Sequence, residues 1–265
     1  MIKSITFKHG KVAFSDTGKG RTVVLLHGFL GSQEIWQHTI EDLSKSYRVI
    51  AIDLPGHGAT DNFGYVHTME LMAKSVKAVL EKLNLKRYVI VGHSMGGYTA
   101  LALADLFPDN IKGICLFHSS AYPDSEEKKR DRTRSIKVVK ANHQIYTSEV
   151  IKNLFAAGNL NNLKKELAFA TKIAGKTKKQ GIIAALEGMK DRPDRSIILG
   201  LVEYPIMMII GAHDNVLPAG QLLEQSKMIK HPHVLYLEND GHMGFLESPE
   251  LCHKGLRKFL RVCFK

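Results

Sequence analysis

The chain has 265 residues, of which 44% are hydrophobic and 24% charged, the composition of a globular protein with a sizeable core. This composition excludes the disordered, collagen-like and coiled-coil classes, and no apolar run approaches the roughly 18 residues of a membrane span. Of the formal net charge of +11, residues 122–200 carry +8, from 17 Lys and Arg against 9 Asp and Glu.

The basic segment is most simply a solvated face, because it has little aromatic interleaving and matches no nucleic-acid-binding motif. Its positive potential also favours the approach of anionic substrates. The N-terminal MIKSITFKHG has no apolar h-region, and Cys115, Cys252 and Cys263 are too few for a disulfide framework or a zinc site. These features predict a cytoplasmic protein with no signal peptide, no nucleic-acid partner and no integral membrane contact.

Short apolar runs alternate with helical patterns along the chain, which is typical of a mostly parallel sheet with helices on both faces. The first two runs, residues 2–8 and 11–17, are separated by His9-Gly10 and predict an antiparallel hairpin. Six further runs predict buried strands at residues 22–27, 48–52, 88–92, 111–117, 207–211 and 233–237. The predicted sheet therefore has eight strands.

Three helices accompany these strands. The first follows the N-cap candidate Thr68 and carries a single apolar stripe, formed by Met69, Met72, Val76, Val79, Leu80 and Leu83. The second spans residues 95–107 and stops before Pro108. The last begins at Pro249 and is expected to turn four side chains inward, those of Leu251, Leu256, Phe259 and Leu260.

Residues 122–200 break the alternation and contain no convincing strand. They offer amphipathic helices instead, with apolar positions at Val150, Ile151, Leu154 and Phe155, then Leu163, Leu167 and Ala170 before Gly175, then Ile182, Leu186 and Met189. An all-helical insertion after the sixth strand predicts a cap over the C-terminal edge of the sheet, where open α/β sheets place their sites. We expect a core of residues 1–121 and 201–265, with the cap as an insertion and not an independent domain.

The motif Gly92-His93-Ser94-Met95-Gly96-Gly97 lies between an apolar strand and an Ala-rich helix. This G-x-S-x-G arrangement predicts a nucleophile elbow, in which the serine sits on a strained turn and the glycines allow neighbouring backbone to approach. The N-terminus of the following helix directs its N–H groups toward a developing oxyanion. His93, on the opposite face of the strand, is expected to support packing.

A serine nucleophile needs a base and an orienting acid. Asp214 follows one strand in GAHDNVLP, and His242 follows the next in ENDGHMGF. The chain order Ser94, Asp214, His242 is the order expected of an α/β-hydrolase triad. His213 and Asp240 are interpreted as turn residues.

The loop HGFLGS follows the third strand and is the expected source of one oxyanion-hole donor. We assign the two backbone N–H donors to Phe29 and Met95. Asp53, after the fourth strand, is interpreted as a turn-stabilising carboxylate. The candidate substrate-pocket residues are His27, Gly28, Leu30, His118, Ser119 and Met243.

The motifs HGFLGS, DLPGHGATD, GHSMGG, GAHDNVLP and GHMGF, in this order, resemble the α/β-hydrolase superfamily over essentially the whole chain. The resemblance implies a capped, cofactor-free serine hydrolase of the carboxylesterase type, with a small ester as substrate and a monomeric or homodimeric state. Ser94, in place of a carboxylate, argues against haloalkane dehalogenases and epoxide hydrolases.

HGFLGS followed by Trp36 is also similar to the menaquinone-pathway lyase that makes succinyl-hydroxy-cyclohexadiene-carboxylate, which uses the same triad for proton abstraction. That lyase typically has Arg after the second glycine of the elbow, where this chain has Tyr98. Arg192 and Arg195 are candidates to replace it. A ligand receptor on a hydrolase scaffold is a third interpretation, although such proteins usually have degenerate triads and this one is complete.

Overall fold

The computed structural model describes residues 2–265 and is built around one sheet. Its strands are β1 (Lys3–Phe7), β2 (Gly10–Thr17), β3 (Thr22–Leu26), β4 (Arg48–Ile52), β5 (Tyr88–His93), β6 (Ile111–Phe117), β7 (Ile206–Gly211) and β8 (Pro232–Leu237). They lie in the order β1-β2-β4-β3-β5-β6-β7-β8. β2 runs antiparallel to both of its neighbours, β1 and β4. All the other pairs, from β4 across the sheet to β8, are parallel.

The centre of the sheet is buried on both faces. Every residue of β3, β5 and β7 is buried, as their unbroken apolar runs require. At the edge of the sheet, β8 instead exposes alternate residues. The predicted hairpin is confirmed by the antiparallel pairing of β1 with β2, and every end of the predicted strands lies within one residue of the observed end.

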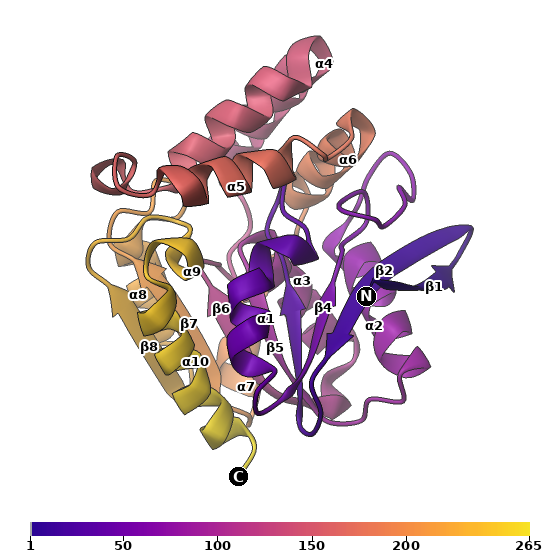
Figure 1. Ribbon diagram of the computed structural model, residues 1–265, viewed down its shortest axis with the longest axis vertical. Helices are drawn as coiled ribbons and strands as arrows, with labels where there is room; N and C mark the ends of the chain where they lie inside the picture. The colour runs from indigo at the N-terminus through magenta and orange to yellow at the C-terminus, as the bar shows by residue number, and fades with distance from the viewer. Residues whose placement is uncertain (1) are drawn as a thin grey trace.

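The helices form a layer on each face of the sheet and a third group above it. They are α1 (Gln37–Leu43), α2 (Met69–Lys82), α3 (Met95–Leu106), α4 (Glu126–Leu154), α5 (Lys164–Ala174), α6 (Lys179–Lys190), α7 (Ser196–Leu201), α8 (Ala219–Ser226), α9 (Gly244–Glu247) and α10 (Pro249–Cys263). Helices α1 and α10 pack together on one face, and α2 and α3 pack together on the other (Figure 1).

Local signals in the sequence fix several helix ends. The Thr68 hydroxyl accepts a hydrogen bond from the N–H of Leu71 at 3.1 Å, so the predicted cap of α2 is confirmed. Helix α10 begins at Pro249 as expected, but the inward placement of Leu251 is wrong, because its side chain is 54% exposed. The buried stripe of α10 runs through Cys252, Leu256, Phe259, Leu260 and Cys263, one residue out of phase with Leu251.

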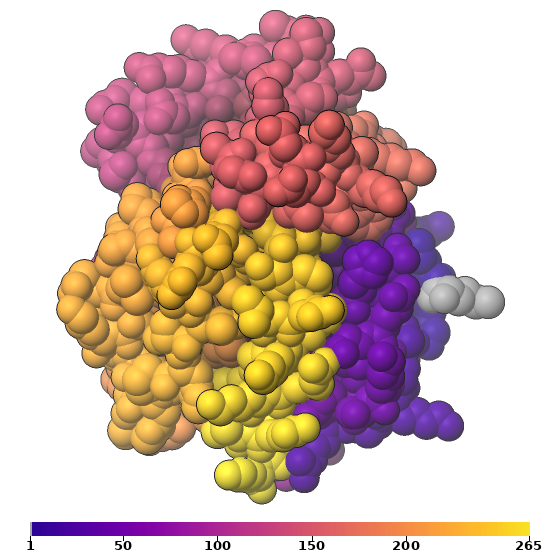
Figure 2. All heavy atoms as spheres, turned by 60° about the vertical axis from the view of Figure 1, so that its left-hand side comes forward, coloured from indigo at the N-terminus to yellow at the C-terminus, as the bar shows by residue number. Residues whose placement is uncertain are grey.

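Helices α4 to α7 form an all-helical insertion after β6, which confirms the predicted architecture. Helices α4, α5 and α6 lie above the carboxyl ends of the parallel strands, and α7 leads back to the start of β7 (Figure 1). In the space-filling view the insertion, coloured pink to coral, covers one end of the molecule (Figure 2). Helix α4 kinks at Asn142, whose φ and ψ are −152° and 96°. The Asn142 side chain accepts from the N–H groups of Gln144 and Ile145, both at 3.1 Å, and so caps the second half of the helix.

No helix within residues 2–265 combines the length and the apolar character needed to cross a bilayer. The finer division into residues 1–121 with 201–265 and a dependent insertion at 122–200 stays a prediction.

Candidate active site

Ser94 occupies the sharp turn between β5 and α3. Its φ of 49° and ψ of −115° lie in a region that L-residues rarely adopt, and surrounding contacts must hold it there. The Ser94 N–H donates to the carbonyl of Phe117 at 3.0 Å, and its own carbonyl accepts from the N–H of Gly97 at 2.8 Å. The elbow expected from the sequence is therefore present as a strained turn braced by β6 and by the first turn of α3.

Two glycines make this turn possible. A Cβ on Gly96 would collide with the carbonyl oxygen of Leu26 at the end of β3, and a Cβ on Gly92 would collide with the carbonyl of Gly96. The strand, the turn and the helix thus approach one another too closely for any side chain at these positions.

Ser119 braces the same turn from below. Its hydroxyl donates to the Ser94 carbonyl at 2.8 Å, and the residue is fully buried. The structure thus places Ser119 under the elbow and not among the residues that line the cavity described below.

His242 and Asp214 come together from the loops after β8 and β7. Nδ1 of His242 lies 2.7 Å from Oδ2 of Asp214, and both side chains are almost completely buried. The other carboxylate oxygen accepts from the N–H groups of Val216 at 2.8 Å and Leu217 at 2.9 Å. Burial alone would raise the pKa of Asp214, but His242, His118 and the N–H of Leu217 outweigh it and hold the pKa below its usual range.

A second histidine faces the same carboxylate. Nδ1 of His118 lies 3.8 Å from Oδ2 of Asp214, while its Nε2 accepts from the N–H of Gly244 at 3.1 Å. Because Nε2 is an acceptor, the neutral ring carries its proton on Nδ1, toward the carboxylate. Burial lowers the pKa of His118 to about 3, with Asp214 opposing the shift and His242 adding to it.

His93 lies beneath His242. Its Nε2 donates to the backbone carbonyl of His242 at 2.8 Å, and its ring packs edge-on against Trp36 and Phe245. The side chain supports the position of the His242 backbone, in agreement with the packing interpretation.

The loop after β3 presents a free backbone donor beside the elbow. Its turn is closed by the N–H of Gly31, which donates to the Gly28 carbonyl at 3.0 Å, and Leu30 adopts a φ of 62°. Within residues 2–265, neither the N–H of Phe29 nor that of Met95 donates a hydrogen bond. Both amides are therefore available to a ligand.

Neighbouring polar residues hold this loop in place. His27 donates from Nδ1 to the Gly28 carbonyl at 2.7 Å and accepts at Nε2 from Leu54, and burial lowers its pKa to about 4. The carboxylate of Asp53 accepts from the backbone N–H of Gln33 at 2.6 Å and that of Ala59 at 2.9 Å. Asp53 thus stabilises two turns, in agreement with its interpretation as a turn-stabilising carboxylate.

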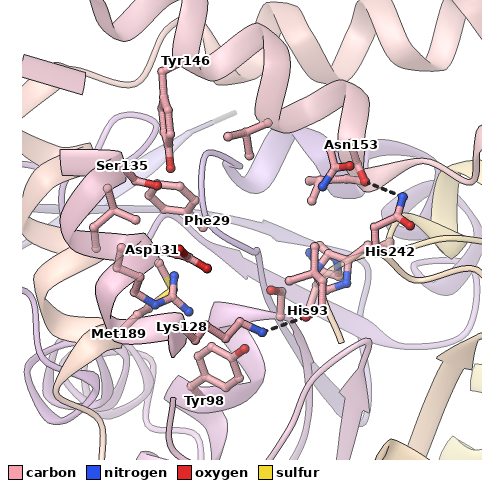
Figure 3. Close-up of a pocket in the computed structure, with 17 residues that line it drawn as sticks. Phe29, His93, Tyr98, Lys128, Asp131, Ser135, Tyr146, Asn153, Met189 and His242 are labelled. Carbon is pink, nitrogen blue, oxygen red and sulfur yellow. Dashed lines mark hydrogen bonds between the residues drawn. The ribbon is translucent and has the colours of Figure 1, made fainter. Parts of the chain in front are cut away.

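A cavity of about 310 Å³ opens above Ser94 and His242 (Figure 3). Its walls combine core loops with the insertion, and its lining comprises Phe29, His93, Ser94, Tyr98, Lys128, Asp131, Arg132, Ser135, Tyr146, Val150, Asn153, Leu154, Leu186, Met189, Asn215, Val216 and His242. Gly28, Leu30 and Met243 line a much smaller cavity beside it. His27, His118 and Ser119 line neither cavity.

The α4 side of the cavity was missed by the sequence interpretation. Lys128, Asp131, Arg132 and Ser135 are spaced so that they share one helix face, but this part of α4 is charged on all sides. An apolar stripe marks a helix in a sequence, and the first half of α4 has none.

Arg192 and Arg195, the arginines considered for a lyase, are both engaged elsewhere. Arg192 donates to Asp124 at 2.6 Å and lies over the ring of Tyr98 at 4.0 Å, while Arg195 pairs with Glu70 and Asp105. Neither lines the cavity. Among residues 2–265, no group of three His, Cys, Asp or Glu side chains is arranged to hold a metal ion.

Comparison with known proteins decides the family. The family model described as "alpha/beta hydrolase fold" matches residues 21–249. The chain belongs to the α/β-hydrolase family. This hydrolase superposes on a thermophilic esterase from Thermogutta terrifontis, solved with malate bound, with a TM-score of 0.94, 29% identity and complete coverage of both chains.

Two curated relatives illustrate the range of this family. The hydrolase is 26% identical to the pimeloyl-[acyl-carrier protein] methyl ester esterase of Nitrosomonas europaea, over 88% of this chain and 93% of that protein. It is 28% identical to the dihydrolipoyllysine-residue acetyltransferase component of the acetoin cleaving system of Pseudomonas putida, over 92% of this chain but only 65% of that longer protein. Esterases are thus among its neighbours, at low identity.

Proposed function

We propose that this hydrolase cleaves small carboxylic esters through an acyl-enzyme formed on Ser94. The observation that carries the proposal is the 2.7 Å contact between His242 and Asp214, in a chain where Ser94 and His242 line the same cavity. A base oriented by a buried carboxylate beside a strained serine is the arrangement that activates a hydroxyl nucleophile.

The acylation step uses the free nitrogen of His242. Because Nδ1–H donates to the ionised Asp214, Nε2 carries the lone pair that accepts the Ser94 proton as Oγ attacks the ester carbonyl. The N–H groups of Phe29 and Met95 receive the oxyanion of the tetrahedral intermediate. Collapse of this intermediate expels the alcohol, which takes its proton from the imidazolium of His242.

The deacylation step repeats the chemistry with water. His242 removes a proton from water as the water oxygen attacks the acyl carbon. When the tetrahedral intermediate collapses, the His242 imidazolium gives this proton to the departing Ser94 Oγ, and the carboxylic acid is released. Asp214 stays ionised throughout and stabilises the imidazolium in both steps.

Two features support a small ester as the substrate. The cavity volume of about 310 Å³ is at the lower end of small-molecule sites, which suits a short acyl chain. The esterase from Thermogutta terrifontis and the methyl ester esterase from Nitrosomonas europaea are both similar to this chain along most of its length. The two arginines considered for the lyase alternative, Arg192 and Arg195, lie outside the cavity lining.

An acyl-transfer experiment tests the covalent intermediate. Phenyl butyrate and p-nitrophenyl butyrate are each turned over in the presence of methanol, and the ratio of methyl butyrate to butyric acid is measured. A common acyl-enzyme predicts the same product ratio from both esters, and Ser94→Ala should abolish both products. A ratio that depends on the leaving group would contradict the acyl-enzyme, and a proton-abstracting lyase would form no transfer product.

A further inference from the structure

One wall of the cavity above Ser94 carries two cationic side chains. Lys128 and Arg132 lie one turn apart on α4, and Ser135 follows on the same face. Figure 3 shows Lys128 extending past Tyr98 toward the side of the cavity where His93 and His242 lie.

The carboxylates nearby do not balance these cations. Arg132 and Arg192 both pair with the single buried carboxylate of Asp124. Asp131 pairs with Arg134 at the rim. Two guanidinium groups thus share one buried carboxylate, which leaves an excess positive charge beside the cavity.

Lys128 has no carboxylate partner at ion-pair distance among residues 2–265. Its ammonium donates one hydrogen bond, to the carbonyl of Val216 at 2.7 Å, and has two further N–H donors. Burial lowers the pKa of Lys128, and Arg132 adds to this shift, while Asp124 opposes it. A partly desolvated cation without a counter-ion is costly unless a ligand supplies the missing charge.

We propose that the ester substrate carries a carboxylate, and that Lys128 and Arg132 bind it. This inference rests on the proposed ester hydrolysis at Ser94 and narrows it to anionic esters, of which a hemiester of a short dicarboxylic acid is the simplest. The cavity of about 310 Å³ has room for such a molecule between the α4 wall and Ser94.

The test compares an anionic ester with its neutral isostere. Monomethyl glutarate is paired with the methyl ester in which an isopropyl group replaces the carboxylate, and kcat/KM is measured for the wild type, Lys128→Met and Lys129→Met. Lys129→Met removes the same charge from the adjacent position. Lys129 pairs with Glu126 and does not line the cavity. It therefore controls for long-range electrostatics.

The wild type should prefer monomethyl glutarate. Lys128→Met should lower kcat/KM for this ester by roughly 10- to 100-fold, mainly through KM, because a hydrogen bond to a charged group is lost. The neutral isostere should change by less than about threefold, Lys129→Met should leave both esters nearly unchanged, and Lys128→Arg should retain the preference.

An equal loss on both esters in Lys128→Met would overturn the proposal, because Lys128 would then act only by holding the Val216 loop. A butyryl ester of glycolate, which carries its carboxylate on the alcohol, shows which side of the ester the cations bind. Sensitivity to Lys128→Met on either anionic ester supports the carboxylate site, and insensitivity on both overturns it.

A binding measurement separates this inference from the proposed function. Calorimetric titration of monomethyl glutarate into the Ser94→Ala variant should show binding. The same titration into the double variant that also carries Lys128→Met should show none. Absence of hydrolysis in the wild type together with Lys128-dependent binding would overturn the esterase proposal alone. Hydrolysis of neutral esters without Lys128-dependent binding would overturn the carboxylate site alone.

Discussion

Two histidines face the Asp214 carboxylate, His242 at 2.7 Å and His118 at 3.8 Å. His118 also accepts a hydrogen bond from Gly244, two residues after His242. One buried ring thus contacts both the candidate acid and the segment that carries the candidate base. Because His118 does not line the cavity, it can act only by positioning Asp214 and the His242 segment.

Replacement of His118 tests this role. His118→Phe preserves a ring but removes both nitrogens, so the Gly244 N–H loses its partner. We expect kcat to fall by about 10- to 100-fold, as is typical when a group that orients a reacting residue is lost. The free energy of unfolding should fall by about 1–3 kcal/mol. Steady-state kinetics and chemical denaturation measure the two effects, and an unchanged kcat would show that His118 only fills space.

The residues of the proposed triad could be found from the sequence because each lies in a short loop directly after a strand. The strand order then brings these loops to one edge of the sheet. The substrate-pocket residues were harder to foresee, since His27 and Ser119 turn inward to brace backbone while Lys128 and Arg132 come from a distant helix. No local pattern shows which helix will cover the site.

At the scale of elements, the junction of β3, β5 and α3 sets the position of Ser94. A Cβ on Gly96 would collide with the carbonyl oxygen of Leu26, whereas a Cβ on Gly220 in α8 would meet no atom within 4 Å. These two glycines therefore provide a matched pair of helical positions with opposite steric surroundings.

Gly96→Ala should destabilise the protein by about 1–3 kcal/mol, because the added methyl group forces α3 away from β3. The resulting displacement of Ser94 should reduce kcat by roughly 100-fold. Gly220→Ala should instead raise the free energy of unfolding by about 0.5–1 kcal/mol and leave kcat unchanged. Equal effects of the two substitutions, in thermal melts and ester hydrolysis, would contradict the steric account.

The insertion is tied to both loops that carry the proposed base and acid. The N–H of His242 donates to the carbonyl of Leu154 at 2.7 Å, and Asn215 donates to the carbonyl of Asn153 at 3.2 Å. Both acceptors lie at the end of α4. Apolar spacing predicted this end of the helix. It gave no sign of the charged first half of α4 or of the kink at Asn142, where the side chain caps the backbone locally.

At the scale of the whole molecule, several buried histidines link folding to pH. Burial lowers the pKa of His27 to about 4, and that of His57 and His118 to about 3. These rings stay neutral in the folded protein, but in the unfolded chain they bind a proton below about pH 6.5. The unfolded state therefore binds more protons between about pH 6.5 and pH 4.

The free energy of unfolding should consequently fall as the pH drops below about 6.5, by about 1.4 kcal/mol per pH unit for each such histidine. Asp214, whose pKa is held below its usual range, adds to the loss below about pH 4. Guanidinium denaturation at pH 7 and at pH 5 should show a decrease of several kcal/mol. Equal stability at the two values would mean that these histidines are solvated or charged in the folded state.

Hydrolysis of p-nitrophenyl esters, from acetate to decanoate, by the wild type and Ser94→Ala tests whether Ser94 is the nucleophile of an esterase. The wild type should show saturable activity that is highest for short acyl chains, as the cavity of about 310 Å³ requires. Ser94→Ala should retain its fold and lose activity by about 10⁴-fold or more. Comparable hydrolysis by the two proteins would mean that Ser94 is not the nucleophile.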